Sequence, residues 1–262
     1  MKLGMPIMIE HSDIFECIRL AEKHQLDFIE INLSFPSYLP LNTDWDLATK
    51  IAKERGLFFT IHADEQLNPF DFNNKVSKCY CECMLETIRL AKNIGASVIN
   101  MHLLKGTYVT LPDKVLFLND IYIEKYLSKV SDFISECENE IGDSKTRIVI
   151  ENVDSGPFTS FQIKALELFM DSPVFGLTFD VGHYECQKGR DRSVFEKFSN
   201  KIIHVHLHDS DGYHPHLALG DGRIEIEKIT ETLPSDVTYL LEVKNMDGIL
   251  RSLEYLKMKG IS

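Results

Sequence analysis

Five of the ten histidines in this 262-residue chain lie within residues 202–222, in the stretch IIHVHLHDSDGYHPHLALGDG. They are His204, His206, His208, His214 and His216. Alternate residues of an extended strand share a face, so the first three are expected to project together, and the last two repeat that spacing. Imidazole is the commonest side-chain metal ligand near neutral pH, and buried rings need polar partners. The stretch indicates metal binding, and a polar strand whose histidines are satisfied by neighbours or water is the alternative.

Short apolar runs alternate with longer amphipathic segments along the chain, which is typical of βα units around a parallel sheet. The expected strands are Lys2–Ile9, Phe28–Leu33, Phe58–His62, Val98–His102, Arg147–Asn152, Gly176–Asp180, Ile202–His208 and Tyr239–Val243. The expected helices are Ser12–His24, Asp44–Arg55, Asn74–Asn93, Ile121–Glu140, Phe161–Met170, Ser193–Ser199, Glu225–Thr232 and Met246–Lys259. Eight units with short links predict an α/β fold, a single (β/α)8 TIM barrel that forms one domain over residues 1–262. A doubly wound open sheet is the alternative. No G-x-G-x-x-G or Walker loop follows a strand, so no nucleotide cofactor is expected.

The net charge and the lengths of the apolar runs limit the kinds of partner that the protein is expected to bind. Acidic side chains outnumber basic ones by 40 to 28, for a net charge of −12, which repels a phosphate backbone and makes nucleic acid an unexpected partner. No apolar run approaches the roughly 20 residues that cross a bilayer, and the first residues lack the pattern of a signal peptide. These features predict a cytoplasmic protein with no membrane partner.

Seven of the eight expected strands contain an ionisable residue, end in one or are closely followed by one. The catalytic groups of such barrels lie at the carboxyl ends of the strands. The ionisable residues are Glu30, His62, His102, Glu151, Asp180 with His183 three residues on, His206 and Glu242. Such residues are costly in apolar surroundings unless they are paired or bind metal. Four of them, which we call the quartet, come from four successive strands: Glu151, Asp180, His206 and Glu242. Three carboxylates and one imidazole suit Mn²⁺, Mg²⁺, Co²⁺ or Zn²⁺.

Two further groups of side chains are predicted around the quartet. His62 and His102 lie on adjacent strands, close enough in a barrel to share Glu151 as a bridging ligand. The members of the other group, placed to gather on the opposite side, are His183, His214 and His216. His204 and His208 are expected to support the site or to pack rather than to bind a metal themselves.

Cationic side chains follow several of the expected strands. Lys105 follows the fourth, Lys244 follows the eighth, and Arg190 lies in the segment after the sixth. Their charges suit an anionic substrate group such as phosphate or carboxylate. Ordinary solvation of loop cations is the alternative.

In this order and spacing the motifs resemble the xylose-isomerase-like TIM barrels, which include sugar and sugar-phosphate isomerases and epimerases and the endonuclease-IV-type enzymes of DNA repair. The resemblance covers essentially the whole chain. It rests on the T-I-H and M-H ends of the third and fourth strands, I-E-N at 150–152, F-D-V-G-H at 179–183, H-V-H-L-H-D at 204–209, H-L-A-L-G-D-G at 216–222 and L-E-V at 241–243.

The resemblance implies that the quartet binds the metal shared by the isomerases and epimerases, and that His183 touches substrate. It also implies that Glu151 and Glu242 flank the sugar carbon, one removing a proton and the other returning it. This mechanism is chemically reasonable independently of the resemblance. A metal chelated by a carbonyl and its neighbouring hydroxyl stabilises the enediolate that forms when the proton leaves.

Three functions are compatible with the sequence. The leading hypothesis is a metal-dependent sugar or sugar-phosphate isomerase or epimerase with a small carbohydrate substrate. The runner-up is zinc-dependent hydrolysis at abasic sites in DNA. The positions that match the three-zinc site of that branch are His62, His102, Glu151, Asp180, His183, His206, His214, His216 and Glu242, with histidine at 214 where the branch has aspartate. The third is a non-catalytic barrel that keeps the metal and binds a ligand. The relatives also imply a homo-oligomer.

Overall fold

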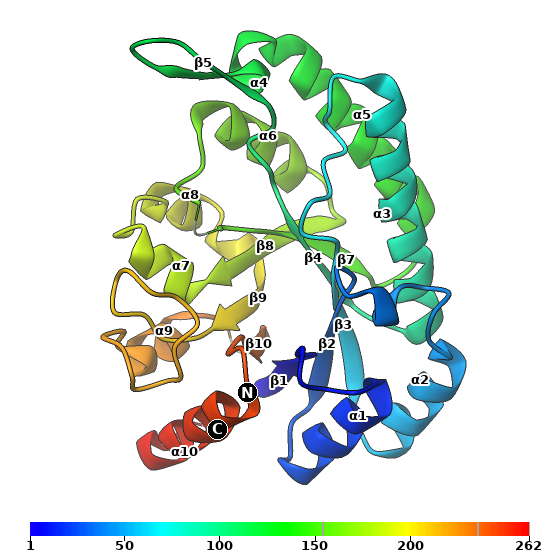
Figure 1. Ribbon diagram of the computed structural model, residues 1–262, viewed down its shortest axis with the longest axis vertical. Helices are drawn as coiled ribbons and strands as arrows, with labels where there is room; N and C mark the ends of the chain where they lie inside the picture. Colours follow the sequence, from blue (N-terminus) through cyan, green and yellow to red (C-terminus); the bar gives the residue numbers. More distant parts are fainter. Residues whose placement is uncertain (154, 235, 262) are drawn as a thin grey trace.

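Eight parallel strands close into a ring in the computed structural model, which describes residues 1–153, 155–234 and 236–261 (Figure 1). Around the ring the order is β1-β10-β9-β8-β7-β4-β3-β2. The strands are β1 (Lys2–Pro6), β2 (Phe28–Asn32), β3 (Phe58–His62), β4 (Val98–His102), β7 (Arg147–Glu151), β8 (Phe175–Asp180), β9 (Ile202–Leu207) and β10 (Thr238–Leu241). The predicted single (β/α)8 barrel is therefore confirmed.

Helices cover the outside of the ring (Figure 1). They are α1 (Ile14–Lys23), α2 (Trp45–Glu54), α3 (Asn74–Ile94), α4 (Leu118–Ile121), α5 (Ile123–Ile141), α6 (Ser160–Asp171), α7 (Val181–Cys186), α8 (Arg192–Lys197), α9 (Ile226–Thr232) and α10 (Met246–Lys259), with 3₁₀ turns at Pro36–Tyr38 and Ser199–Lys201. Side-chain caps fix where helices begin: the Asp13 carboxylate accepts from the N–H of Glu16, and Thr159 and Gln162 form a capping box. In the described parts of the chain, no helix is both long enough and apolar enough to cross a membrane.

The two faces of each strand have different roles, because successive side chains of a strand point to opposite sides. Ile148 and Ile150 of β7 are fully buried in the apolar core. The interior of the ring holds buried polar groups instead. The Thr178 hydroxyl donates to Asn100 Oδ1 at 2.6 Å, and the Thr60 hydroxyl donates to Glu30 Oε2 at 2.9 Å. The barrel therefore carries a polar interior beneath the carboxyl ends of its strands.

Several element boundaries differ from the expectation. Strand β1 ends at Pro6 rather than Ile9, and a proline has no N–H to donate to a ladder. Strands β9 and β10 end one and two residues early, so His208 and Glu242 directly follow their strands. The helix expected over 121–140 is two helices, α4 and α5, with Tyr122 between them.

A β-hairpin and a short helix were not expected from the sequence. A two-stranded hairpin, β5 (Tyr108–Thr110) with β6 (Val115–Phe117), stands away from the ring at the upper left of Figure 1. Its strands have only three residues each, which is too short for a clear alternating pattern. Helix α7, at six residues, follows β8 directly and carries His183.

Candidate active site

The structure brings the quartet together at the carboxyl ends of β7, β8, β9 and β10. One ligand atom from each of the four side chains lies within 4.8 Å of the others. The Nδ1 atom of His206 lies 3.2 Å from Glu151 Oε1, 3.1 Å from Glu242 Oε2 and 3.7 Å from Asp180 Oδ2. A single imidazole nitrogen thus faces three carboxylates.

Because the four side chains are buried, their arrangement is energetically unfavourable without a bound cation. Glu151 is 1% exposed, and Asp180 and His206 are fully buried. Both ring nitrogens of His206 and the Oε2 atom of Glu242 are buried without a hydrogen-bond partner. Unsatisfied buried polar atoms are rare in proteins and indicate an unfilled requirement, which a divalent cation bound by oxygen and imidazole ligands would meet. The residues therefore fit a metal ion.

Mutual electrostatics set the protonation of the quartet. Burial alone would raise the pKa of the Glu151 carboxyl, but His206 and His102 outweigh it and hold that pKa well below its usual value. Glu242 behaves in the same way, with burial outweighed by His206 and Lys244. Burial lowers the pKa of His206, whereas Glu151 and Glu242 raise it well above 6.5. The carboxylates are ionised at neutral pH, and a bound cation would take the place of the proton on His206.

His62 and His102 join Glu151 as expected. Their Nε2 atoms lie 3.4 and 3.3 Å from Glu151 Oε2, and the three side chains form a second group of potential ligands within 4.8 Å. His62 Nδ1 lies 2.8 Å from the carbonyl oxygen of Ala63, which can only accept, so Nδ1 carries a proton and Nε2 is directed at Glu151. This is how a neighbouring carbonyl fixes the tautomer of a metal-binding histidine.

The third expected group forms, but with His208 in the place of His214. His183 and His216 come together, but the histidine within 4.8 Å of both is His208. The structure does not bring His214 to the site, because its side chain is 76% exposed and its Nδ1 lies 2.8 Å from Asp211 Oδ2. The Asp211 carboxylate also accepts from the backbone N–H of His214, which fixes the turn with this ring outward.

The three expected substrate-binding cations occupy different places. Lys244 Nζ lies 2.8 Å from Glu242 Oε1, so it contacts the quartet. Lys105 donates to the carbonyl of Ser155 at 2.9 Å, and Arg190 donates to the backbone carbonyl of Gln187 at 3.1 Å. The pKa of Lys105 is lowered by burial.

Two asparagines that the sequence did not single out support the quartet. Asn100 is fully buried and donates to Glu151 Oε2, while its own oxygen accepts from Thr178. Asn152 donates to the backbone carbonyl of Asp180 and accepts from the N–H of the same residue, both at 2.9 Å. Asn100 lies two residues before His102 on the same strand, so the two side chains point to the same face of the sheet. This alternation was a signal that could have identified Asn100.

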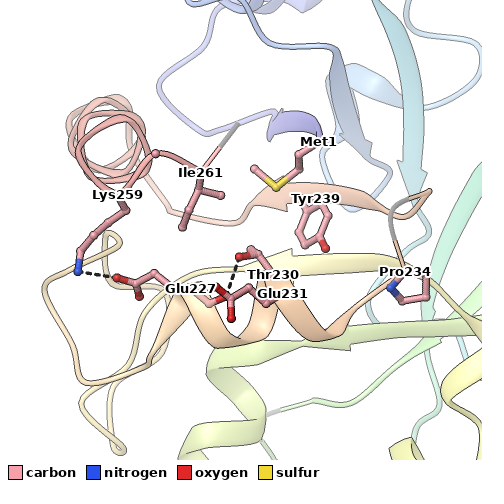
Figure 2. A pocket seen from close by; sticks show the side chains of 9 residues that line it. Met1, Glu227, Thr230, Glu231, Pro234, Tyr239, Lys259 and Ile261 are labelled. Atoms are coloured by element: carbon pink, nitrogen blue, oxygen red, sulfur yellow. Dashed lines mark hydrogen bonds and ion pairs between the residues drawn. The ribbon is translucent and has the colours of Figure 1, made fainter.

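A separate surface hollow of about 390 Å³ lies between α9 and α10, beside the start of β1 (Figure 2). Glu227 and Lys259 form an ion pair on its wall, at 2.5 Å. None of the clustered histidines and carboxylates lines this hollow.

Comparison with known proteins agrees with this fold. The chain is 29% identical over 252 residues to the uncharacterized protein MJ1311 of Methanocaldococcus jannaschii, covering 91% of this chain and 82% of that one. Among solved structures, a D-tagatose 3-epimerase-like protein superposes with a TM-score of 0.76 at 26% identity, covering 100% of this chain and 98% of the other. The IOLI protein with a bound zinc atom also superposes with a TM-score of 0.76, at 16% identity and the same coverages, which shows a shared fold.

The description of the matching family model is xylose isomerase-like TIM barrel, and the match extends over residues 18–258. This range contains every residue of the quartet and of the two neighbouring histidine groups. The resemblance noted in the sequence is confirmed, and the chain belongs to the xylose isomerase-like TIM barrel family.

Proposed function

We propose that the protein is a divalent-metal-dependent isomerase or epimerase of sugars or sugar phosphates, which moves a proton through an enediolate. One observation carries the proposal: Glu151 and Glu242 reach the same nitrogen of His206, at 3.2 and 3.1 Å, from the two ends of the row β7, β8, β9, β10. Two carboxyl groups that reach one site from different strands suit removal of a proton from one face of a carbon by the ionised group, and delivery of a proton to the other face by the second group once it has been protonated. The similarity to a D-tagatose 3-epimerase-like protein supports this reading.

The quartet is the proposed metal site, for Mn²⁺, Mg²⁺, Co²⁺ or Zn²⁺. When bound, the cation supplies a Lewis acid that polarises the carbonyl and the neighbouring hydroxyl of an α-hydroxy ketone. Glu151 is the proposed base at the carbon beside that carbonyl, and the Asn100 amide orients its carboxylate. Glu242 is ionised at rest, so it takes a proton from the Lys244 ammonium at 2.8 Å and delivers that proton to the opposite face. Lys244 then regains a proton from solvent, and Glu151 releases to solvent the proton that it removed from carbon.

His183 is the proposed substrate-contacting side chain beside the two carboxylates. Its Nδ1 lies 3.1 Å from the carbonyl oxygen of Asn152, which fixes the ring and leaves the other nitrogen for a substrate hydroxyl. Lys105 and Arg190, together with Lys244, are the proposed anchors of an anionic group if the sugar is phosphorylated.

A zinc hydrolase acting on abasic DNA is the second candidate, favoured by the assembled group of His62, His102 and Glu151. His62, His102 and His216 are proposed as ligands of additional metals there, with His183. His214 lies outside the site, and the net charge of −12 opposes a DNA partner. A metal-containing ligand-binding barrel without catalysis is the third.

Product analysis separates these functions. The metal-loaded protein is expected to convert one member of a panel of ketopentoses and ketohexoses, free and phosphorylated, into its epimer or aldose isomer, as detected by chromatography. The same preparation is tested on duplex DNA with one abasic site, where no nicking is expected. Nicking without sugar conversion would establish the hydrolase instead, and binding of a sugar without conversion would establish the non-catalytic barrel.

A further inference from the structure

His208 is fully buried between the quartet and the loop that follows β9, which we call the clasp loop and define as residues 209–224. Its Nδ1 lies 2.7 Å from the backbone nitrogen of His216, in a hydrogen bond that the N–H donates. A nitrogen that accepts a hydrogen bond has no proton of its own, so His208 is the neutral tautomer protonated on Nε2. The 3.3 Å contact of the same Nδ1 with the carbonyl oxygen of Asp209 is longer and has no proton to share.

The protonated Nε2 faces a quartet ligand. It lies 3.0 Å from both Oδ1 and Oδ2 of Asp180, so the single N–H is shared between the two carboxylate oxygens. Oδ1 also accepts from the backbone N–H of His183 at 2.6 Å. The carboxylate of Asp180 is thereby held in one orientation, with Oδ2 3.7 Å from His206 Nδ1.

These contacts exclude His208 as a metal ligand, although it lies within 4.8 Å of His183 and His216. One nitrogen is used by a backbone donor and the other donates to Asp180, so no lone pair is free. The ring is also closely packed: a Cβ added to Gly182 would lie 2.0 Å from its Cε1 atom. Glycine at position 182 is required for His208 to occupy this place.

The clasp loop is itself anchored by a buried carboxylate. Asp209 accepts from the backbone N–H groups of Ser210, Gly220 and Ile224, at 2.8, 3.0 and 3.1 Å. His216 has a left-handed backbone conformation, with φ of +61°, which is uncommon for a residue other than glycine. That conformation aims its N–H at His208, while its Nδ1 donates to the backbone carbonyl of Glu242 at 3.1 Å.

We propose that His208 is a positioning residue that couples metal binding at Asp180 to the conformation of the clasp loop. Its ring joins the carboxylate of Asp180 on one side to the N–H of His216 on the other. An ordered Asp180 favours an ordered loop, and the loop favours the ligand orientation, since coupling between two sites is reciprocal. The inference rests on the metal site of the proposed function.

Four variants test this coupling with Co²⁺ and Mn²⁺ as probes, in calorimetry and in hydrogen exchange measured by mass spectrometry. His208→Leu removes both contacts, and Gly182→Ala displaces the ring while leaving every polar side chain present. His208→Gln is the rescue, because its amide offers one donor and one acceptor at a separation close to that of the ring nitrogens. His214→Ala is the control in the same loop, where the side chain is 76% exposed.

In the wild type, metal is expected to slow exchange of the peptide that contains His216. His208→Leu and Gly182→Ala are expected to bind metal about 10–100-fold more weakly and to lose that metal-dependent protection. The visible spectrum of bound Co²⁺ is expected to change in both, while His208→Gln and His214→Ala keep wild-type behaviour. Unchanged affinity and protection in His208→Leu would overturn the inference. A wild type that binds no metal would overturn the proposed function as well.

Discussion

Replacing Glu151 by glutamine is expected to lower the rate of sugar conversion by roughly 10²- to 10⁴-fold, the range that general acid–base catalysis contributes. Glutamine has nearly the same size but cannot take up a proton from carbon. The Glu151 side chain is 1% exposed and bonded to Asn100, so the change leaves the packing intact. The measurement is the initial rate at saturating substrate, with metal content determined for each preparation.

A matched control separates catalysis from metal loss and from general damage. Glu65 lies in the loop after β3, at the same end of the barrel, and its carboxylate accepts from the Asn32 amide. Glu65→Gln is expected to retain the wild-type rate. Because Glu151 is also a proposed ligand, the variant is assayed at metal concentrations that saturate it. A metal-saturated Glu151→Gln protein with the wild-type rate would contradict the assignment of Glu151 as the base.

Removing the metal is expected to lower the thermal midpoint of unfolding by roughly 5–10 °C. A ligand present at 100 times its Kd stabilises the native state by about 2.7 kcal/mol, and about 1 kcal/mol corresponds to roughly 2–4 °C for a domain of this size. The physical reason is that the cation neutralises three carboxylates that converge on His206. Differential scanning calorimetry before and after chelation measures the effect.

Asp180→Asn tests whether the quartet is the source of that stabilisation. The variant removes one negative charge yet keeps an oxygen that can accept from the N–H of His183. The metal-dependent shift of the midpoint is expected to fall to within about 2 °C in this variant. A full shift in Asp180→Asn would place the stabilising metal elsewhere in the protein.

The barrel was predictable because its strands are apolar runs that end in ionisable residues. His62, His102, Glu151 and Asp180 each end a strand, and parallel strands bring such ends to one rim. Register then places neighbours side by side, as the pairing of His102 with Glu151 shows. Strand ends therefore indicated Glu151, Asp180, His62 and His102, whereas His206 lies one residue inside β9 and Glu242 directly follows β10.

The roles of the later histidines were not predictable from spacing. His214 and His216 are two residues apart and look equivalent, yet the left-handed backbone of His216 turns its ring inward while Asp211 holds the other outward. His208 was expected only to support or pack. Its contact with Asp180 depends on the space left by Gly182. The hydrophobic periodicity of the sequence does not encode packing at this level of detail.

The hairpin β5–β6 and helix α7 were missed for a different reason. Both are too short for a pattern to repeat clearly, since each strand of the hairpin has three residues and α7 has six, and the residues of β5 are exposed on both faces. Helix α7 nevertheless matters to the site, because the backbone N–H of its His183 donates to the quartet ligand Asp180 and its Gly182 lies against the ring of His208.

Solvent deuterium exchange tests the central claim most directly. The metal-loaded protein is incubated in D₂O with each sugar of the panel, and ¹H NMR follows the carbon-bound protons. We predict deuterium at a single carbon next to the carbonyl, loss of the exchange after chelation, recovery with Mn²⁺ or Co²⁺, and no exchange in Glu151→Gln. Sugar conversion without deuterium at that carbon, or exchange that continues in the metal-free protein, would contradict metal-assisted proton transfer by the quartet.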